Sequence, residues 1–385
     1  MCVLVVKMDE HGKPDRSKSR IVVLGNLEAR TWGKHEPAAS VMKYPSLCMM
    51  VSGAVEQHCK LKQADYKNPF CNPTLPDDET TIIHPPLGDP DATPGEYWLL
   101  KKTLYGLRHS PKHWYDMASA ALLAMGLTQS VHDPCLFHGV PSSPDHPAQP
   151  GDPPITIGLY VDDMVYYSID DDIEKRFKNI LASKFNISFM GVVTWFLGTH
   201  FTWIDLPNGE ISVHLSQIAF AQNLVERYRQ QDININPRAT PYRSGLPIDS
   251  LMTYSGDMED ASFLRLWSQY QSIVGSLNWL ATNTRPDLAP VTSFLAAYCH
   301  HPTKQHMDAA LYAIKYVRHT AEYGIAFHSH AATSTSAFVH FPFHHDIEAY
   351  SDALPPTEAE QHELTAYSDA CWGSQLGSST PPDRN

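Results

Sequence analysis

Residues 159–165 read Leu-Tyr-Val-Asp-Asp-Met-Val, so a pair of acids, Asp162 and Asp163, stands in the middle of an apolar run. Neighbouring residues of a strand point to opposite faces of a sheet, so one continuous strand would bury one of the two carboxylates. A tight turn between a strand over 155–161 and a second strand over 164–168 presents both carboxylates at one sheet edge. We therefore predict a β-hairpin whose turn carries the acidic pair.

The acidic pair has two interpretations. Close carboxylates repel each other, and burying them costs free energy unless they are paired or bound to a metal ion. Mg²⁺ relieves that repulsion, because it prefers hard oxygen ligands together with substrate phosphates. A turn in which both acids are solvated is the alternative, since Asp is common in turns. The fragment by itself leaves both interpretations open.

A third acid, Asp65, stands at the end of a predicted short strand and opens the segment 65–71, Asp-Tyr-Lys-Asn-Pro-Phe-Cys. Two-metal sites draw carboxylates from more than one strand. Asp65 therefore joins Asp162 and Asp163 if the two predicted strands are neighbours in one sheet. Taken alone, Asp65 is better explained as a helix cap or a surface acid.

The rest of the chain shows the periodicities of both strands and helices. A proline- and glycine-rich stretch over 139–154 indicates an exposed loop. We predict hairpins over 3–24 and 201–213, and helices over 41–60, 112–127, 170–185, 215–228, 263–282 and 303–320. Strands and helices mix in the first half and helices dominate the second, which indicates an α+β fold.

Composition limits the function. At 385 residues the chain is long enough for two or more hydrophobic cores, and its apolar (43%) and charged (18%) fractions are those of a globular protein. The net charge of −13 argues against general coating of nucleic acid, so a nucleic-acid channel would have to be local. Seven scattered cysteines without a CxxC pair indicate reduced thiols. Since we find neither an apolar run of roughly 18 residues nor a secretory signal, we expect an intracellular protein of the cytoplasm or nucleus, with no membrane segment.

Three segments together resemble a known family. Residues 160–163, Tyr-Val-Asp-Asp, resemble the active-site turn of reverse transcriptases, and 65–71 resembles the motif that carries their first catalytic Asp. Residues 100–115 contain Leu-Tyr-Gly-Leu, then Ser-Pro, then Trp-Tyr, and resemble a block of the copia-type (yeast Ty-like) LTR retrotransposon polymerases. The three blocks in this order are much more specific than any one of them.

The resemblance extends over most of the chain. Residues 18–22, Lys-Ser-Arg-Ile-Val, resemble the fingers hairpin of the family, and 195–198, Trp-Phe-Leu-Gly, resemble the segment that leads into its primer-holding hairpin. Residues 270–287 resemble the block that ends in Thr-Arg-Pro-Asp. Residues 366–373, Ala-Tyr-Ser-Asp-Ala-Cys-Trp-Gly, resemble the first strand of the fused RNase H domain, with Asp369 as its acid.

The resemblance implies an α+β fold, with palm and fingers around an antiparallel sheet, followed by a helical thumb and connection. The implied domains are partial fingers over 1–60, palm and fingers with the catalytic motifs over 61–213, thumb and connection helices over 214–325, and connection with a truncated RNase H start over 326–385. Because the later RNase H acids are missing after Asp369, we expect no RNase H activity.

The resemblance also implies an activity, that of an RNA-directed DNA polymerase, with an RNA template, a DNA primer and dNTP as partners. Two Mg²⁺ (or Mn²⁺) ions would be held by Asp65, Asp162 and Asp163, with a further ligand in the backbone carbonyl of Tyr66. The primer 3′-hydroxyl would attack the α-phosphate of the dNTP in line. Such a mechanism relies on positioning and charge stabilisation rather than on covalent catalysis.

Further binding residues follow from the same resemblance. The nucleotide-binding residues would be Lys18, Arg20, Phe70, Tyr105 and Gly106, and the primer-holding residues would be Trp195, Phe196, Leu197 and Gly198. Phe70 would exclude a 2′-hydroxyl by steric contact with the sugar, whereas its spacing alone fits a core phenylalanine better. Lys18 and Arg20 would contact the triphosphate, with a solvated hairpin face as the alternative.

Some positions depart from the family pattern. Pro69 stands where a small residue is usual, and it removes a backbone N–H from a loop whose amides face the triphosphate in this enzyme class. Pro69 and the negative net charge both favour a second interpretation, in which the chain is a catalytically inactive retrotransposon remnant or a domesticated binding protein.

A two-metal nuclease is a third interpretation, but no motif supplies its water-activating base. We recognise no His/Cys zinc set, and we expect Trp114 and Tyr115 in the core.

Overall fold

The computed structural model describes residues 2–8, 14–27, 39–77, 79–86, 88–207, 209–228, 238–242 and 253–329. The chain forms two compact units. The first consists of Met1–Val193 and Pro207–Ile211, and the second of Thr194–Leu206 and Ser212–Asn385. Among the described residues, no helix has both the length and the apolar character that a membrane crossing requires.

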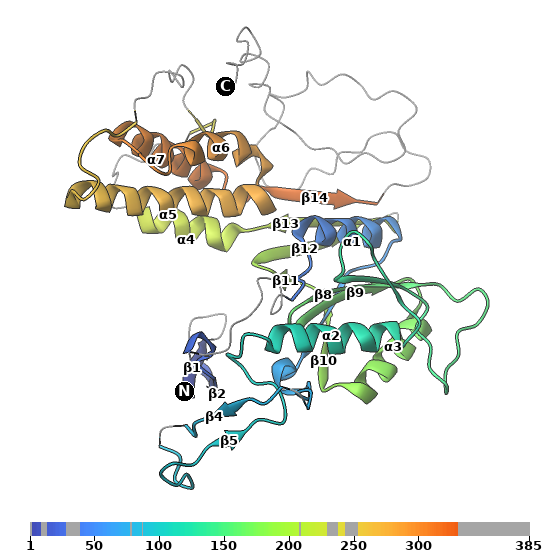
Figure 1. Ribbon diagram of the computed structural model, residues 1–385. Helices are drawn as coiled ribbons and strands as arrows, with labels where there is room; N and C mark the ends of the chain where they lie inside the picture. The colour runs from blue at the N-terminus through green and yellow to red at the C-terminus, as the bar shows by residue number, and fades with distance from the viewer. Residues whose placement is uncertain are drawn as a thin grey trace, which may run out of the picture. The chain divides into compact units, whose positions relative to one another are not determined.

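The first unit is built on a six-stranded antiparallel sheet with the strand order β10-β3-β9-β8-β7-β6. The strands are β3 (Lys62–Tyr66), β6 (Thr128–Gln129), β7 (Leu136–Gly139), β8 (Ile155–Tyr160), β9 (Asp163–Ser168) and β10 (Ile187–Val192). The central pair β8 and β9 is the hairpin predicted around the acidic pair, and β3 is its neighbour on the β9 side (Figure 1).

Three helices cover the two faces of this sheet: α1 (Tyr44–Glu56), α2 (Ser110–Leu123) and α3 (Asp171–Lys184). Tyr166 and Tyr167 of β9 point to opposite faces. The Tyr166 ring packs against Phe177 of α3, whereas the Tyr167 hydroxyl lies against Gly53 of α1. The sheet is therefore sandwiched between α1 and α3, as Figure 1 shows.

The predicted start of α3 is confirmed in atomic detail. The Asp170 carboxylate accepts hydrogen bonds from the N–H groups of Asp172 and Ile173 at 2.8 and 2.9 Å. These are N–H groups that a helix start leaves without a partner inside the helix, and a capping side chain satisfies them. The cap fixes where α3 begins, shortly after strand β9.

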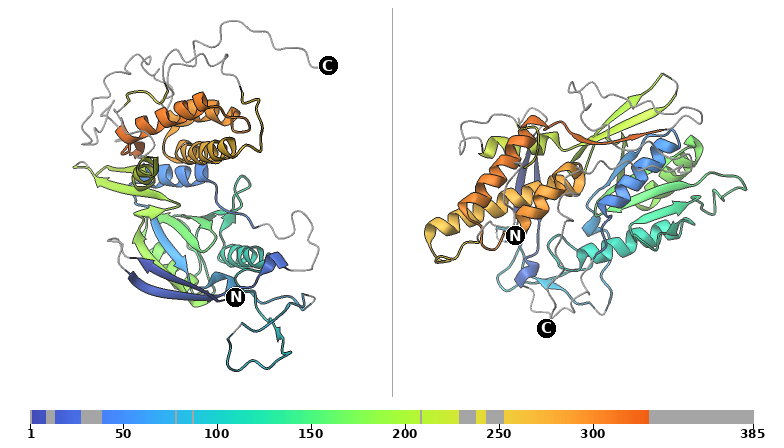
Figure 2. Two further views of the ribbon diagram at one scale, coloured as in Figure 1. Left: turned by 90° about the vertical axis from the view of Figure 1, so that its left-hand side faces the viewer. Right: turned by 90° about the horizontal axis from the view of Figure 1, so that it is seen from above.

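Smaller elements surround the sheet. A separate two-stranded ribbon of β1 (Cys2–Met8) and β2 (Pro14–Ile21) stands outside it (Figure 2), and β4 (Ile82–Ile83) pairs with β5 (Trp98–Leu99). Two 3₁₀ turns, η1 (Gly25–Leu27) and η2 (Pro69–Cys71), follow β2 and β3. The prediction that the second strand of the first hairpin runs to Leu24 is wrong, because β2 ends at Ile21 and the N–H of Val23 bonds to the Tyr105 carbonyl at 2.8 Å.

The second unit combines a four-stranded sheet with helices. Its sheet has the order β11 (Trp195–Phe196), β12 (Thr199–Asp205), β13 (Ile211–Ser216), β14 (Gly324–His328). Its helices are α4 (Ile218–Tyr228), α5 (Ala261–Asn283), α6 (Ala289–Ala297) and α7 (Lys304–His319), with the 3₁₀ turn η5 (Pro286–Leu288) before α6. The four helices bury a shared apolar core that includes Tyr270, Leu277, Leu280, Ala310 and Ala313.

The predicted start of one helix in the second unit is wrong. Residues 215–216 belong to β13, not to the predicted helix over 215–228, because β13 pairs with β14 more than a hundred residues later in the chain. The helix α6 and the strand β14 were not predicted. The α+β fold class is confirmed, whereas the proposed domain ranges stay predictions, and Asp369 lies outside the described residues.

Candidate active site

The turn of the β8–β9 hairpin has Val161 and Asp162 as its two central residues, because Tyr160 pairs with Asp163. Val161 has a φ of +56°, in the left-handed region that β-branched residues avoid. Such a conformation costs on the order of 1–3 kcal/mol and persists only where the surroundings hold it. The turn that carries the acids is therefore strained and held by its neighbours.

Hydrogen bonds hold this turn from two elements. The indole Nε1 of Trp114 in α2 donates to the Val161 carbonyl at 2.6 Å, and the N–H of Tyr66 in β3 donates to the Asp162 carbonyl at 2.9 Å. Trp114 is 2% exposed, so this bond lies in the core. The prediction that Trp114 is a core residue is confirmed, but its role in holding the turn was not predicted.

An aromatic cluster supports both donors. The Tyr66 ring meets the Trp114 ring edge-on at 4.9 Å between centroids, and Phe185, which follows α3, contacts both at 5.4 and 5.6 Å. Such edge-to-face contacts add stabilisation beyond area burial. Burial also raises the pKa of the Tyr66 hydroxyl, which keeps that side chain neutral. The cluster packs β3 and α2 against each other, so that both hydrogen-bond donors to the turn are held in place.

The structure brings Asp65 together with the acidic pair. Strand β3 pairs with β9 in antiparallel register, and Asp65 stands directly opposite Asp163. The bond between Tyr66 and the Asp162 carbonyl makes the Asp65–Asp163 pair a non-hydrogen-bonded one, in which side chains approach most closely. Their Cβ atoms therefore lie about 4.5–5.5 Å apart on the same face of the sheet.

Three acidic side chains lie close together at this sheet edge, and their charges affect one another. Burial raises the pKa of Asp163 to about 6, and the charges of Asp162 and Asp65 contribute to this rise. The side-chain amide of Gln63 donates to Asp163 Oδ1 at 3.3 Å and opposes the rise. Three carboxylates therefore repel one another at one sheet edge, which is the condition that a bound divalent cation relieves.

The donor set fits magnesium or manganese. All three side chains offer carboxylate oxygens, the ligands that these hard cations prefer. In an antiparallel strand the N–H and C=O of one residue point to the same side, so the Tyr66 carbonyl, like its N–H, is directed towards the Asp162 turn. The predicted metal ligands Asp65, Tyr66, Asp162 and Asp163 thus converge, while their roles stay predictions.

Three of the predicted nucleotide-binding residues, Arg20, Phe70 and Tyr105, lie in one cluster centred on Tyr105. The Phe70 ring meets the Tyr105 ring edge-on at 5.1 Å, and the Arg20 guanidinium lies over the same ring at 5.1 Å. Burial raises the pKa of the Tyr105 hydroxyl, Arg20 lowers it and Asp162 raises it. Tyr105 is thus within electrostatic reach of both the basic strand β2 and the acidic turn. Lys18 lies two residues before Arg20 in β2, and its side chain lies outside the described residues.

Gly106 lies against the chain's own backbone. Its φ is +92°, and a Cβ at this position would stand 2.0 Å from the Val23 carbonyl oxygen. The missing side chain therefore makes room for the chain's own backbone after the β1–β2 ribbon, while a role of Gly106 in nucleotide binding stays a prediction. Glycine is required here for both its conformation and its size.

Pro69 occupies the first position of η2, after Asn68 in the left-handed conformation (φ +51°). At the start of a helix the N–H has no partner inside the helix, so proline is tolerated there. The turn closes normally, with the Cys71 N–H bonded to the Asn68 carbonyl at 2.9 Å. Thr103 Oγ1 donates to the Phe70 carbonyl at 2.6 Å and ties this turn to the segment before Tyr105.

The predicted primer-holding residues form a tight hairpin of their own. Trp195 and Phe196 make up β11, and Leu197 (φ +49°) and Gly198 (φ +77°) form the turn to β12. Positive φ at both central residues is the signature of a type I′ hairpin turn. This hairpin belongs to the second unit, and its role towards a primer stays a prediction.

Fold and site together have the organisation of a polymerase palm, an antiparallel hairpin with paired acids beside a third acid on the next strand. A family model described as "Reverse transcriptase (RNA-dependent DNA polymerase)" matches residues 2–244, more than half of the chain. The chain therefore belongs to the reverse transcriptase (RNA-dependent DNA polymerase) family.

The curated relatives are polyproteins of transposable elements. The chain is 29% identical over 323 residues to the retrovirus-related Pol polyprotein from transposon RE1 of Arabidopsis thaliana, a match that covers 84% of this chain and 20% of the relative. It is 26% identical over 254 residues to a putative transposon Ty5-1 protein of Saccharomyces cerevisiae, covering 66% of this chain and 74% of that protein. The chain thus spans about a fifth of the Arabidopsis polyprotein.

Among solved structures, the chain is similar to a foamy viral protease–reverse transcriptase solved in complex with double-stranded DNA. The match has a TM-score of 0.37 and 14% sequence identity, and it covers 82% of this chain and 43% of the viral chain.

Proposed function

We propose that this chain is the RNA-directed DNA polymerase of a copia-type retrotransposon and transfers a nucleotide from dNTP to the 3′-hydroxyl of a primer paired with an RNA template. The observation that carries the proposal is the register of β3 and β9. It places Asp65 opposite Asp163, beside the strained turn of Asp162, in a chain that belongs to the reverse transcriptase family.

In this proposal Asp65, Asp162 and Asp163, with the Tyr66 carbonyl, hold two divalent ions. When bound, these ions lower the pKa of the attacking hydroxyl and neutralise the charge on the triphosphate and the leaving pyrophosphate. The hydroxyl proton passes to solvent and a bond forms between the primer 3′-oxygen and the α-phosphorus. The bond from that phosphorus to the pyrophosphate oxygen breaks, and its electron pair leaves with the pyrophosphate. The protein's part is to fix the carboxylates, which Trp114 does through the turn.

The cluster around Tyr105 would receive the incoming nucleotide. Arg20 brings positive charge from β2 to the ring of Tyr105, which Asp162 also reaches electrostatically, and positive side chains suit a triphosphate. Lys18 would add a second positive charge from the same strand. Phe70 is held edge-on against Tyr105, so its ring is fixed in position and can act as a steric barrier to a 2′-hydroxyl. Trp195, Phe196, Leu197 and Gly198 would support the primer.

Primer extension on poly(rA)/oligo(dT) with Mg²⁺ or Mn²⁺ tests this function. Asp162→Asn should lower the rate on the order of 100-fold or more, because a catalytic metal supplies several kcal/mol of charge stabilisation. Asp145→Asn, in the exposed loop over 139–154, makes the same chemical change away from the acids and should leave the rate unchanged. Equal incorporation by the wild type and Asp162→Asn would exclude these acids as the source of the activity.

The second candidate is a binding protein without polymerase activity. It is favoured by Pro69, which removes an amide from the loop after Asp65, and by the net charge of −13. A wild-type chain that binds the primer–template but extends it no faster than Asp162→Asn would support this candidate.

A further inference from the structure

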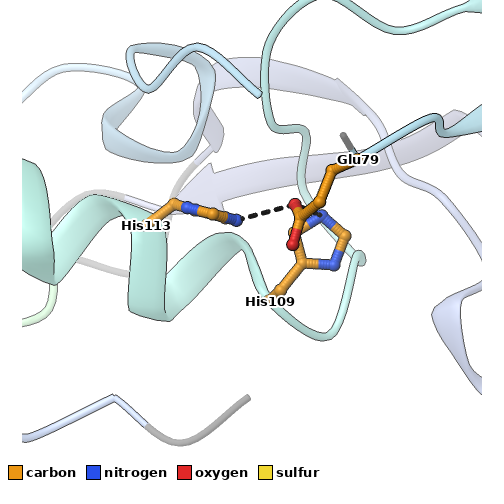
Figure 3. Close-up of side chains that lie close together, drawn as sticks. All are labelled: Glu79, His109 and His113. Carbon is orange, nitrogen blue, oxygen red and sulfur yellow. Dashed lines mark hydrogen bonds and ion pairs between the residues drawn. The ribbon is translucent and has the colours of Figure 1, made fainter. Parts of the chain in front are cut away.

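A second group of metal-ligating side chains lies at the start of α2, formed by Glu79, His109 and His113 (Figure 3). We call it the Glu–His–His cluster. His109 precedes the first residue of α2 and His113 lies four residues later, so both rings fall on the same face of the helix. Glu79 comes from the segment between η2 and β4, and its carboxylate reaches between the two rings.

The three side chains lie almost as close together as the ligands of one metal ion. Glu79 Oε2 lies 3.0 Å from His113 Nε2 and 3.8 Å from His109 Nε2, and one ligand atom from each of the three residues lies within 4.8 Å of the others. Tetrahedral zinc with bonds of 2.0–2.1 Å holds its ligands about 3.3 Å apart. Small side-chain rotations would therefore bring all three donors to one ion.

We propose that the Glu–His–His cluster binds Zn²⁺ or a similar transition-metal ion. Two imidazole nitrogens and one carboxylate oxygen are a common zinc ligand set, which leaves the fourth position to water. Imidazole nitrogen suits zinc and is a poor ligand for Mg²⁺, which takes oxygen. This site therefore differs in chemistry from the three acids of the catalytic edge, and its metal does not depend on the proposed polymerase function.

The cluster is partly buried yet reachable from solvent. His109 is 3% exposed, and both histidines lie at the N-terminal end of α2. A neutral imidazole keeps the lone pair that a metal requires. The side chains of Glu79 and His113 are 18% and 21% exposed, so solvent can deliver the ion and occupy the open position.

A metal here would join two distant parts of the first unit. Glu79 and His113 are 34 residues apart in sequence, and cross-links that close long segments restrict the unfolded chain most. The next residue in α2, Trp114, holds the catalytic turn through the Val161 carbonyl. The metal would therefore fix the segment after the Asp65 motif against the helix that supports the active site.

The test is zinc titration of the full chain in a background of millimolar Mg²⁺, with a chromophoric chelator as competitor. The wild type should bind one equivalent of Zn²⁺ that Glu79→Gln and His113→Gln lose. The loss of affinity should exceed the roughly 10–100-fold that follows removal of a residue outside the ligand set. His146→Gln, in the exposed loop over 139–154, is the matched control and should keep the full stoichiometry.

Both substitutions are conservative and change half-buried side chains. Far-UV circular dichroism and thermal unfolding of each variant would test whether it folds. Co²⁺ provides a second readout, since its visible absorption reports tetrahedral ligation. That band should appear with the wild type and with His146→Gln but not with Glu79→Gln. Equal zinc binding by the wild type, Glu79→Gln and His113→Gln would overturn the proposal, and so would a wild type that binds no zinc. Either result would leave the cluster as an ion pair between Glu79 and the histidines.

Discussion

Asp163 stands where three carboxylates meet, opposite Asp65 and next to Asp162. Its neighbours disfavour its charge, and burial raises its pKa to about 6 from the usual 3.8. The folded state therefore binds this proton more tightly than the unfolded state does. The stability associated with the protonated acid is present below about pH 4 and is lost as the pH rises to about 6.

Asp163→Asn should therefore stabilise the protein above pH 6 and have little effect near pH 4, because the protonated acid and the amide are both neutral. Thermal unfolding at pH 4 and pH 7.5 measures this difference. Mg²⁺ should raise the unfolding temperature of the wild type at pH 7.5 more than that of Asp163→Asn. Asp145→Asn, an exposed change, serves as the control. An equal effect of Asp163→Asn at both pH values would contradict the assignment of the repulsion to this residue.

Among the helices and strands, α2 and β3 hold the Val161–Asp162 turn through hydrogen bonds to its two carbonyl groups. Val161 adopts a strained conformation, and the Trp114 indole N–H donates a hydrogen bond to its carbonyl. The indole nitrogen is the part of Trp114 that makes this bond, while its ring packs against Tyr66 and Phe185. The two contributions are therefore separable by substitution.

Trp114→Phe keeps an aromatic ring in the cluster but removes the N–H donor, so the Val161 carbonyl loses a buried partner. We expect a loss of about 1–3 kcal/mol in the free energy of unfolding, measured by urea denaturation. The rate of primer extension should fall as well, because the turn that positions Asp162 is no longer held. Met117→Leu, at an exposed position of the same helix, should change neither quantity. Unchanged extension by Trp114→Phe would show that the turn holds its conformation without this bond.

The junction between the β1–β2 ribbon and the segment 105–106 depends on a glycine. Gly106→Ala would place a Cβ 2.0 Å from the Val23 carbonyl oxygen. Gly151→Ala is the matched control, because Gly151 has a similar φ (+95°) but open space around it. Both changes impose backbone strain of roughly 1–2 kcal/mol, and Gly106→Ala should cost about 1–3 kcal/mol more for the clash. Equal losses in urea denaturation would argue against close packing at this junction.

At the scale of the whole molecule, each of the two compact units has an interior of its own. The acids lie in the first unit, whereas the helical core around Leu277 lies in the second. Separate cores allow one unit to lose stability without a change in the other. The metal affinity of the acids should therefore be insensitive to the packing of the helical core.

Leu277→Ala tests this separation. Leu277 is fully buried, and the cavity left by its truncation should lower the stability of the second unit by about 2–5 kcal/mol. Calorimetry should show one transition shifted to lower temperature, while Mn²⁺ binding at 25 °C keeps its wild-type affinity. A parallel loss of Mn²⁺ affinity would show instead that the two units are energetically coupled.

The hairpin around Asp162 and Asp163 was predictable because it is local. Two short apolar runs on either side of an acidic pair allow few other arrangements, and the cap at Asp170 follows from neighbouring residues alone. The short strands β6 and β7 and the glycine-containing β10 carry weaker patterns. They exist because neighbouring strands supply their hydrogen-bond partners.

The sequence by itself determined the α+β class, the acidic turn and the position of Asp65 at a strand end, because these follow from periodicity and chemistry within a few residues. Only the tertiary structure decided that Asp65 faces Asp163, that Trp114 holds Val161, and that Glu79 reaches His109 and His113. Each of these contacts joins residues far apart in the chain. Their partners are selected by sheet register and helix packing, which no short segment of sequence encodes.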